Sequence, residues 1–580
     1  MSHELKTNSD FDPVTLEVIR NAVKATAEEM GTVLRRTAYS TNIKDRMDFS
    51  CAVYDADGQT LAQAEHIPLH LGLMPDAVKT ALDEVENVEP GDSVMHNDPY
   101  VSGSHLFDVM VFTPVFYEGE RIAVVGNLAH HVDVGGAGPA KKAEISEIFE
   151  EGIRFPPVKI RKDGELDEEL VDVFLHNLRT REVSSGDFSA QVGATLKGES
   201  NVVELAEKYG AETFTDYMDV MLDYSENRIR ESIRDIPNGT GSFTDYIETE
   251  APVADADEIP ISVEIEVDDD EIAVDFSGTS EQVRGPLNAA RPLTLSCVYY
   301  VVKAVVDPDL PTNDGAYRPI RVHTPEGSLV NANFPAPTQM ANSLTCQRIA
   351  DTLLGAFKEI VPERVMAACT GSMNGFGIIG QQPDRDEMYS YVETYGGGQG
   401  AKHDEDGMDG VHTNMTNSQN APVEILENTY PFEIDRYELV ENSEGAGEYR
   451  GGVGMTREIH VTNEADVYIN TARMRRKPWG VDGGHDAAPT EVDIVHPDGT
   501  SEEFDSTFVN LEVPANTSIQ FRTAGGGGWG SPLERDPEAV AEDVRGGLIS
   551  KERARDVYGV VVSGETVDYE ATDARREQLR

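Results

Sequence analysis

The sequence His105-Leu-Phe-Asp108 is followed, across a predicted hairpin, by His130-His131-Val-Asp133-Val-Gly-Gly136, and these segments organise the first part of the fold. Residues 109–116 form an apolar run rich in β-branched side chains, residues 117–120 contain a glycine turn, and residues 121–128 return as a second apolar run. Two such runs joined by a short glycine-containing turn predict a β-hairpin. The histidines and the carboxylate therefore lie at the open end of one hairpin.

The register of this hairpin decides which side chains meet. If Phe116 pairs with Arg121, counting back along the two strands places Phe107 opposite His130. His105 is then the diagonal neighbour of His130, roughly 7–8 Å away across the sheet.

Residues 105–108 must turn rather than extend, because an ideal strand would put Asp108 on the face opposite His105. With that turn, two imidazoles and one carboxylate converge, and such a set leaves coordination positions of a metal free for water or substrate. We therefore take His105, Asp108 and His130 as candidate catalytic and metal-binding residues. Two alternatives stay open: a slip of one residue that points His131 inward instead of His130, and a half-buried histidine pair whose hydrogen bonds are satisfied and whose role is structural.

Charged residues also precede the next predicted strand, which covers residues 49–55. Arg46 and Asp48 stand just before it. The usual interpretation is a surface ion pair, and the functional one makes Asp48 a further metal ligand. His66 and His70 flank a proline, and we interpret them as loop histidines that are candidates for lining a cleft.

Composition narrows the class of protein. With 48 Lys and Arg against 105 Asp and Glu, the 580 residues carry a net charge of −57, and the acidic excess is spread along the whole chain. Nucleic acid and anionic membrane surfaces are therefore not expected as partners. Such a surface, with a pI near 4.4, is typical of halophilic proteins, because high salt screens most of the self-repulsion. A hydrophobic content of 39% argues against a disordered acidic chain.

The cysteines and the N-terminus indicate the compartment. Cys51, Cys297, Cys346 and Cys369 are isolated in apolar surroundings, without any CxxC motif, as expected for free thiols in a reducing compartment. The first residues lack an apolar signal region, and no run approaches the roughly 18 apolar residues of a membrane span. We expect a soluble cytoplasmic protein.

The fold class follows from the order of patterns along the chain. A helix starts at Asp12-Pro13 and runs to about residue 39, helical spacing returns over residues 187–233, and residues 261–267 alternate as in an antiparallel sheet. We predict an α+β, multidomain protein with mixed and antiparallel sheets and packed helices. Its predicted domains are a metal-binding α+β domain (1–235), a central α+β domain (236–440) and a mainly β C-terminal domain with terminal helices (441–580).

Two glycine-rich stretches, residues 393–400 and 524–530, carry neither the Lys-Ser/Thr of a phosphate-binding loop nor the GxGxxG of a dinucleotide fold. We therefore assign no nucleotide site to this chain and expect close backbone packing at turns. Arg154 and Arg179 are basic residues in an acidic chain, which suits either an anion site or pairing with carboxylates.

Ten segments, spread in order over nearly the whole chain, carry a family resemblance. They are Asn42–Ser50, His66–His70, Asn97–Tyr100, Gly103–Asp108, Ala129–Gly136, Asp275–Ser280, Asn417–Glu424, Tyr449–Gly454, Gly525–Gly530 and Tyr558–Val560. Together they resemble the hydantoinase B/5-oxoprolinase family, whose relatives include the large subunits of acetone and acetophenone carboxylases. The resemblance implies a divalent metal, zinc in lactam-opening members or manganese in carboxylases, held by His105, Asp108 and His130, with Asp48 as a candidate fourth ligand.

The resemblance also implies a partner and a reaction. Its members act with a hydantoinase A-type subunit that carries the ATP site, so we expect this chain in a hetero-oligomer. The expected reaction is ATP-dependent opening of a small cyclic amide, such as N-methylhydantoin, hydantoin or 5-oxoproline, by metal-activated water. The enzyme alternative is an ATP-dependent ketone carboxylase of the acetone type. The non-enzyme alternative is a scaffold that only stabilises its ATP-binding partner.

Overall fold

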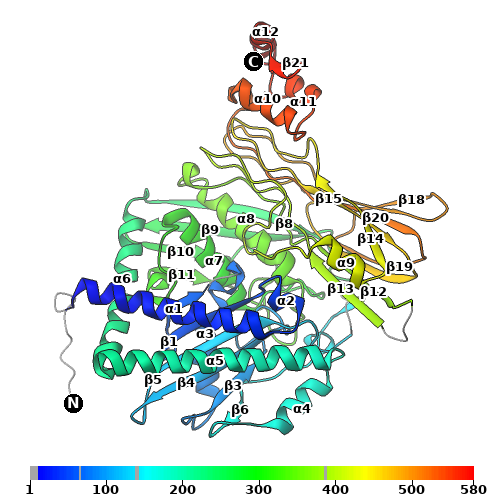
Figure 1. Ribbon diagram of the computed structural model, residues 1–580. Coiled ribbons are helices and arrows are strands. Elements are labelled where there is room, and N and C mark those ends of the chain that lie inside the picture. The colour runs from blue at the N-terminus through cyan, green and yellow to red at the C-terminus, as the bar shows by residue number, and fades with distance from the viewer. Residues whose placement is uncertain (1–10, 65–66, 138–142, 384–387) are drawn as a thin grey trace.

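An antiparallel sheet of seven strands, in the order β2-β1-β5-β4-β3-β6-β7, carries the predicted hairpin as β4 and β5 (Figure 1). The computed structural model describes residues 11–64, 67–137, 143–383 and 388–580, so His66 lies outside the described residues. The strands of this sheet are β1 (Phe49–Asp55), β2 (Thr60–Ala64), β3 (Ser93–His96), β4 (Asp108–Tyr117), β5 (Glu120–His130), β6 (Val158–Lys162) and β7 (Glu165–Leu166).

Two long helices, α1 (Pro13–Thr37) and α5 (Arg181–Tyr209), cover one face of this sheet (Figure 1). α1 begins where the sequence predicts, because the Asp12 carboxylate accepts a hydrogen bond from the Thr15 amide at 2.9 Å and Pro13 occupies the first helical position. The apolar side of α1 is buried against the sheet and α5.

The helical pattern predicted over residues 187–233 belongs to two helices rather than one. Gly210 has a φ of 85°, a value that glycine adopts without strain, and it separates α5 from α6 (Ala211–Arg234). The shorter helices of this region are α2 (Thr41–Lys44), α3 (Leu73–Glu84) and α4 (Glu168–His176).

The opposite face of the seven-stranded sheet shares a core with a second sheet, of order β11-β10-β9-β8. In this second sheet β10 and β11 run parallel and the other pairs antiparallel. Helices α3, α7 and α8 contribute to the shared core, and a π-helical turn, η6 (Ala341–Thr345), leads into α8. The remaining elements are β8 (Gly239–Glu248), β9 (Glu258–Asp268), β10 (Glu271–Asp275), β11 (Ile320–His323), α7 (Arg291–Val306) and α8 (Cys346–Phe357).

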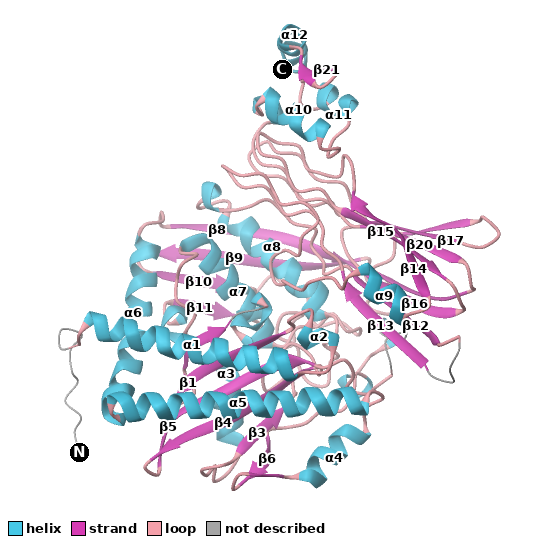
Figure 2. Ribbon diagram, viewed as in Figure 1, coloured by secondary structure: helices cyan, strands magenta, loops and turns pink. Residues whose placement is uncertain are grey.

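The last third of the chain is mainly a β sandwich, whose two sheets have the orders β13-β12-β16-β19 and β14-β15-β20-β17-β18 and enclose one apolar core (Figure 2). Its elements are β12 (Gly375–Gln381), β13 (Met388–Thr394), α9 (Val423–Thr429), β14 (Phe432–Leu439), β15 (Met455–Val461), β16 (Ala465–Asn470), β17 (Glu491–Val495), β18 (Ser501–Phe504), β19 (Phe508–Val513) and β20 (Thr517–Arg522). The sandwich draws strands from both sides of residue 440, and the division into three domains stays a prediction.

Glycine-rich loops run side by side from the sandwich to the C-terminal helices (Figure 2). Gly526 donates to the Gly452 carbonyl and Gly452 donates to the Gln399 carbonyl, at 2.9 and 2.8 Å. A Cβ atom on Gly526 would lie 2.0 Å from the Gln399 carbonyl oxygen, so only glycine permits this approach. The glycines therefore serve close backbone packing, between extended segments as well as at turns.

The chain ends in a small helical cap, α10 (Pro537–Arg545), α11 (Lys551–Asp556) and α12 (Tyr569–Leu579), with the short pair β21 (Val562–Ser563) and β22 (Thr566–Val567). None of the helices in the described ranges is long and apolar enough to cross a membrane. The predicted α+β class, with antiparallel and mixed sheets and packed helices, is confirmed.

Candidate functional site

Three of the predicted site residues lie in one row at the edge of the seven-stranded sheet where β1 and β4 begin and β5 ends. His130 ends β5, and the β4–β5 pairing sets Asp108 directly opposite it. On the other side, Phe49 pairs with Ala129, which places Asp48 beside His130, and the His130 amide donates to the Asp48 carbonyl at 3.0 Å. Because directly paired residues of neighbouring strands project to the same face, Asp48, His130 and Asp108 share one face of the sheet.

The register differs from the predicted one, and the predicted pairing of Phe107 with His130 is wrong. Phe116 does pair with Arg121, but a β-bulge between Val115 and Phe116 shifts the rest of the ladder by one residue. A bulge adds one unpaired residue to one strand, so every later pair moves along by one position. The shift brings the carboxylate of the motif, instead of the phenyl ring, opposite the histidine.

A turn at residues 105–108 compensates for this shift. The Asp108 amide donates to the His105 carbonyl at 3.1 Å, so the chain folds back and His105 approaches His130. The centroids of the two imidazole rings are 4.9 Å apart, and Nε2 of His105 lies 3.5 Å from a carboxylate oxygen of Asp108. The structure thus brings the three residues of the predicted hairpin site together, and we refer to them with Asp48 as the His130 cluster.

His131 does not take part in the His130 cluster. Its Nε2 lies 2.8 Å from the side-chain oxygen of Gln191 on α5, and its amide donates to the Phe107 carbonyl at 2.9 Å. The Gln191 amide is fixed in turn by the Val109 carbonyl and the Asn127 side chain. His131 is therefore a buried, hydrogen-bonded histidine on the helix-covered side of the sheet, as in the structural alternative, whereas its neighbour in sequence lies on the other side.

Asn342, which no sequence pattern singles out, contacts His105. In the π-helical turn η6, Nδ2 of Asn342 lies 3.2 Å from Nε2 of His105. A π turn leaves no periodic signal in a sequence, although such turns occur frequently at functional sites. The segment before α8 thus supplies a polar contact to the cluster from outside the first sheet.

Two further residues that the sequence analysis did not assign to the site lie behind His130. Nδ2 of Asn42 lies 3.2 Å from Nδ1 of His130, and Arg46 donates to Oδ1 of Asn42 at 3.1 Å. Because a guanidinium only donates, the oxygen of Asn42 faces Arg46 and its nitrogen faces His130. Arg46 is buried and forms no ion pair with any described residue, so the surface ion pair with Asp48 is not present. The only signal for these residues is their place in the family-like segment 42–50.

His70 approaches the cluster from η2 (Pro68–Leu71). Its ring is buried, and Nδ1 lies 2.8 Å from the Ser50 hydroxyl. Burial lowers the pKa of His70, and the nearby negative charges of Asp108 and Asp48 raise it by less. The predicted loop histidine therefore belongs to the immediate surroundings of the site.

Burial and charge set the protonation states in the cluster. Burial alone would raise the pKa of Asp108, but the imidazoles of His105, His70 and His130 hold it well below its usual value. Burial lowers the pKa of His130 to about 4. Near neutral pH, Asp108 is an ionised carboxylate and His130 is a neutral imidazole, and these are the forms that bind metals.

Imidazole nitrogens and carboxylate oxygens, the donor atoms of the His130 cluster, are ligand types that divalent metals accept. Two ligand atoms, each about 2.1 Å from a tetrahedral ion, lie roughly 3.4 Å apart, and Nε2 of His105 lies 3.5 Å from Asp108. Nδ1 of His105 is buried without a hydrogen-bond partner among the described residues. In the same part of the chain, no group of three or more His, Cys, Asp or Glu side chains is arranged closely enough to hold an ion. The metal therefore stays a prediction.

The other basic residues singled out from the sequence are paired with carboxylates. Arg154 bonds to Asp98 at 3.1 Å and Arg179 bonds to Asp133 at 3.0 Å, so the pairing alternative holds for both. The four cysteines are free and buried, and burial raises the pKa of each thiol. Such thiols are unreactive.

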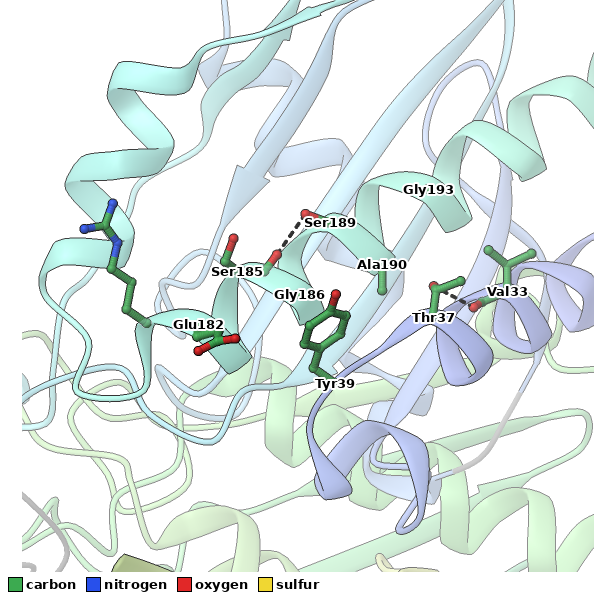
Figure 3. Close-up of a pocket in the computed structure, with 10 residues that line it drawn as sticks. Val33, Thr37, Tyr39, Glu182, Ser185, Gly186, Ser189, Ala190 and Gly193 are labelled. Atoms are coloured by element: carbon green, nitrogen blue, oxygen red, sulfur yellow. Dashed lines mark hydrogen bonds between the residues drawn. The ribbon is translucent and has the colours of Figure 1, made fainter. Parts of the chain in front are cut away.

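A surface cavity of about 710 Å³ lies between the end of α1 and the start of α5, lined by none of the cluster residues (Figure 3). The Tyr39 ring lies against Gly186, where a Cβ atom would be 2.3 Å from the ring. Serine, glycine and alanine residues make up much of its lining, which contains no histidine. We assign no chemical role to this cavity.

Comparison with known proteins gives one consistent result. The family model described as Hydantoinase B/oxoprolinase matches residues 12–532. The B-type subunit of a putative D-/L-hydantoinase from a Pseudomonas species is 33% identical over 98% of this chain and 98% of its own length. The beta subunit of caprolactamase from Pseudomonas jessenii is 32% identical over 97% of this chain and 99% of its own length.

Two solved structures share the fold. The crystal structure of ATP-dependent caprolactamase from Pseudomonas jessenii has a TM-score of 0.90 at 30% identity, covering 98% of this chain and 100% of that chain. Nucleotide-free acetone carboxylase has a TM-score of 0.91 at 21% identity, covering 99% of this chain and 84% of that chain.

Proposed function

The chain belongs to the hydantoinase B/oxoprolinase family, and from this premise we propose that it is the ring-opening subunit of an ATP-dependent cyclic amide hydrolase. The observation that carries the proposal is the convergence of His105, Asp108 and His130, with Asp48 in the same row, at one edge of a buried sheet. Hydantoin, N-methylhydantoin and 5-oxoproline are the proposed substrates, and caprolactamase extends the class to simple lactams.

We propose that a hydantoinase A-type partner carries the ATP site. The two relatives in Pseudomonas are named as the B-type and beta subunits of their enzymes, which implies a second kind of subunit in each. The glycine-rich segments of this chain are occupied in backbone packing, and its net charge of −57 opposes a nucleotide at any unshielded position. Phosphorylation of the amide oxygen by the partner would activate a bond that is otherwise stable.

His105, Asp108 and His130, with Asp48 as fourth candidate, are the residues that would hold the metal. Zinc or manganese supplies Lewis-acid polarisation of a carbonyl and lowers the pKa of water toward neutrality. The protein prepares the position, because Ser104 hydrogen bonds to the Asp108 carboxylate through both its amide and its hydroxyl, Asn42 orients His130 and Asn342 orients His105. Asp48, His105 and Asp108 are buried and His130 is half-buried, which limits the access of competing water.

The test is co-expression with the A-type partner, followed by ATP-dependent ring opening of hydantoins and 5-oxoproline. We expect no ATP hydrolysis and no ring opening by this chain alone, and both activities in the complex. His105→Ala should abolish ring opening while the complex still assembles. His403→Ala, which removes an exposed histidine, is the matched control and should leave the activity unchanged. Tight ATP binding by the isolated chain, or ring opening without ATP, would contradict the division of labour.

The same preparation separates the two alternatives. Bicarbonate-dependent turnover of acetone or a similar ketone would identify a carboxylase, for which the present support is a shared fold at 21% identity. A complex whose activity does not change in His105→Ala would identify a scaffold. Because its reaction consumes ATP and its four cysteines are free, we propose that the complex works in the cytoplasm.

A further inference from the structure

One buried arginine of this chain differs from all the others in the described ranges. Six arginine side chains are buried there: Arg46, Arg348, Arg450, Arg457, Arg473 and Arg535. Five of them form ion pairs with carboxylates, at distances between 2.6 and 3.1 Å. Arg46 is only 7% exposed and forms none with any residue that the structure describes.

The contacts of Arg46 are neutral. Its two terminal nitrogens donate to Oδ1 of Asn42 at 3.1 Å and to the Thr394 hydroxyl at 3.2 Å, and its Nε has no partner among the described residues. A buried cation normally has a carboxylate, a phosphate or another anion beside it, because losing water without such a partner is costly. In a chain with a net charge of −57, acids to pair with Arg46 are abundant, yet no carboxylate among the described residues lies within ion-pair distance of it.

A second polar group faces the same region. The His412 side chain is half-buried, its Nδ1 lies 3.2 Å from the Thr416 hydroxyl, and its buried Nε2 has no hydrogen-bond partner within the described part of the chain. Burial and the charge of Arg46 lower the pKa of His412, whereas the Thr394 backbone and the charge of Asp48 raise it. Arg46 itself donates to the Thr394 hydroxyl, so Arg46 and His412 lie near the same segment. Both lie next to the site, because Asn42 connects Arg46 directly to His130.

We propose that Arg46, with His412 beside it, is an oxyanion-binding subsite next to the His130 cluster. Its ligand is a phosphoryl or carboxylate group, the two anions whose oxygens match a guanidinium. The subsite would draw a negatively charged group into a protein whose overall field repels anions. The assignment of this anion to the phosphorylated ring or to the carboxylate that ring opening releases rests on the proposed function, whereas the binding itself does not.

The proposal is tested by anion binding to the full chain, purified with its partner and freed of metal by a chelator. Titration calorimetry with inorganic phosphate and, separately, with acetate is carried out at constant ionic strength in chloride. We expect saturable binding of at least one anion, weakened about tenfold or more in Arg46→Met, which is a loss of at least about 1.4 kcal/mol. Arg46→Lys should bind more weakly than wild type and more tightly than Arg46→Met.

Two controls separate this subsite from the metal and from general destabilisation. Arg535→Met removes a buried arginine that is paired with Asp406 and Asp543, so it should lower the melting temperature but leave anion binding intact. His105→Ala should also retain the binding, whereas an anion held by metal that the chelator left behind would be lost with it.

Each outcome decides the proposal. Binding of phosphate that depends on Arg46 identifies a phosphoryl subsite, and binding of acetate alone with that dependence identifies a carboxylate subsite. Equal affinities in wild type and Arg46→Met, or no binding of either anion, would overturn the proposal. Loss of ring opening without loss of anion binding in His105→Ala would leave this subsite standing while testing the proposed function separately.

Discussion

Two buried clusters, the His130 cluster and a charge network around Arg473, both join segments that are far apart in the sequence, but they handle their charges differently. In the network, Arg473 bonds to Asp351 at 2.7 Å and to Asp245 at 3.0 Å, and Arg348 bonds to Asp245 at 3.1 Å. Each charge has an opposite charge in contact. Near His130, by contrast, the Arg46 guanidinium has no carboxylate within ion-pair distance in the described ranges, and its hydrogen bonds go to neutral groups.

This difference separates a structural role from a functional one. A charged group that is buried and paired strongly destabilises the fold when its partner is removed, because the remaining charge is left without compensation. A buried cation without an opposite charge in contact needs an explanation in any native structure, and we interpret the one near His130 as a position prepared for a ligand. We therefore expect changes in the Arg473 network to affect stability and changes in the His130 cluster to affect binding and activity.

The largest effect on stability is expected from breaking the Arg473 network. Arg473→Met leaves Asp245 and Asp351 buried without their main cation, and it should lower the free energy of unfolding by about 3–5 kcal/mol. Arg476→Met is the matched control, because Arg476 is 44% exposed and pairs with Glu258 at the surface, where such a pair contributes roughly 0–1 kcal/mol. Urea titration of both variants measures the difference. Equal losses would contradict the distinction between the clusters.

A second prediction concerns the pH range in which each cluster loses its contribution to the free energy of unfolding. Burial holds the pKa of His130 at about 4 against a usual 6.5, so its neutral form stabilises the fold above pH 6.5. That contribution is lost as the pH falls from about 6.5 to about 4 and amounts to about 3 kcal/mol. The free energy of unfolding of the metal-free chain should fall through this window, and His130→Gln should flatten the slope. An unchanged slope in the variant would refute the assignment.

Within the Arg473 network, the Asp245 carboxylate should respond at lower pH and by a smaller amount, whereas burial raises the pKa of the second carboxylate, Asp351. Burial alone would raise the pKa of Asp245, but Arg348 and Arg473 lower it to about 2. Because the folded pKa is depressed, the ionised form stabilises the fold above the unfolded value near 4, by about 2 kcal/mol, and this is lost as the pH falls to about 2. A stability curve with its second step between pH 4 and 2 is expected, and a step that lies above pH 5 would not fit.

The smallest effect per group is expected at the surface, where neither cluster contributes. With a net charge of −57, repulsion between carboxylates extends over about 30 Å at 0.01 M salt and about 3 Å at 1 M. The melting temperature should therefore rise by a few degrees with potassium chloride, equally in wild type and in Arg46→Met. A melting temperature that is independent of salt would reject the predicted adaptation to high salt.

The sequence allowed the elements of the site to be predicted better than its geometry. The β4–β5 hairpin is predictable from its two apolar runs and the glycine turn, and the assumed pairing of Phe116 with Arg121 is present. The turn at residues 105–108 is predictable because an extended strand would put Asp108 on the face opposite His105. The bulge between Val115 and Phe116 was not, because a single unpaired residue leaves the alternation of the strands nearly intact. His105 and His130 still meet, since the turn at 105–108 offsets the shift that the bulge introduces.

Contacts between segments that are far apart in the sequence could not be predicted from local sequence patterns. Asn342 reaches His105 from a π-helical turn 237 residues away, and Arg46 bonds to Thr394 at a separation of 348 residues. Neither periodicity nor local motifs encode such pairs, which depend on how the sheets pack. The glycine-rich segments show the same limit, because their composition predicted close packing but not that several extended segments would lie side by side.

The central claim is that the His130 cluster binds a metal, and elemental analysis of the complex tests it most directly. Wild type and His403→Ala should each contain about one zinc or manganese per chain after exhaustive dialysis, whereas His105→Ala and Asp108→Ala should contain almost none. The melting temperature of each variant, measured in chelator, controls for folding. Equal metal content in all four proteins, or none in wild type grown with both metals, would contradict the account.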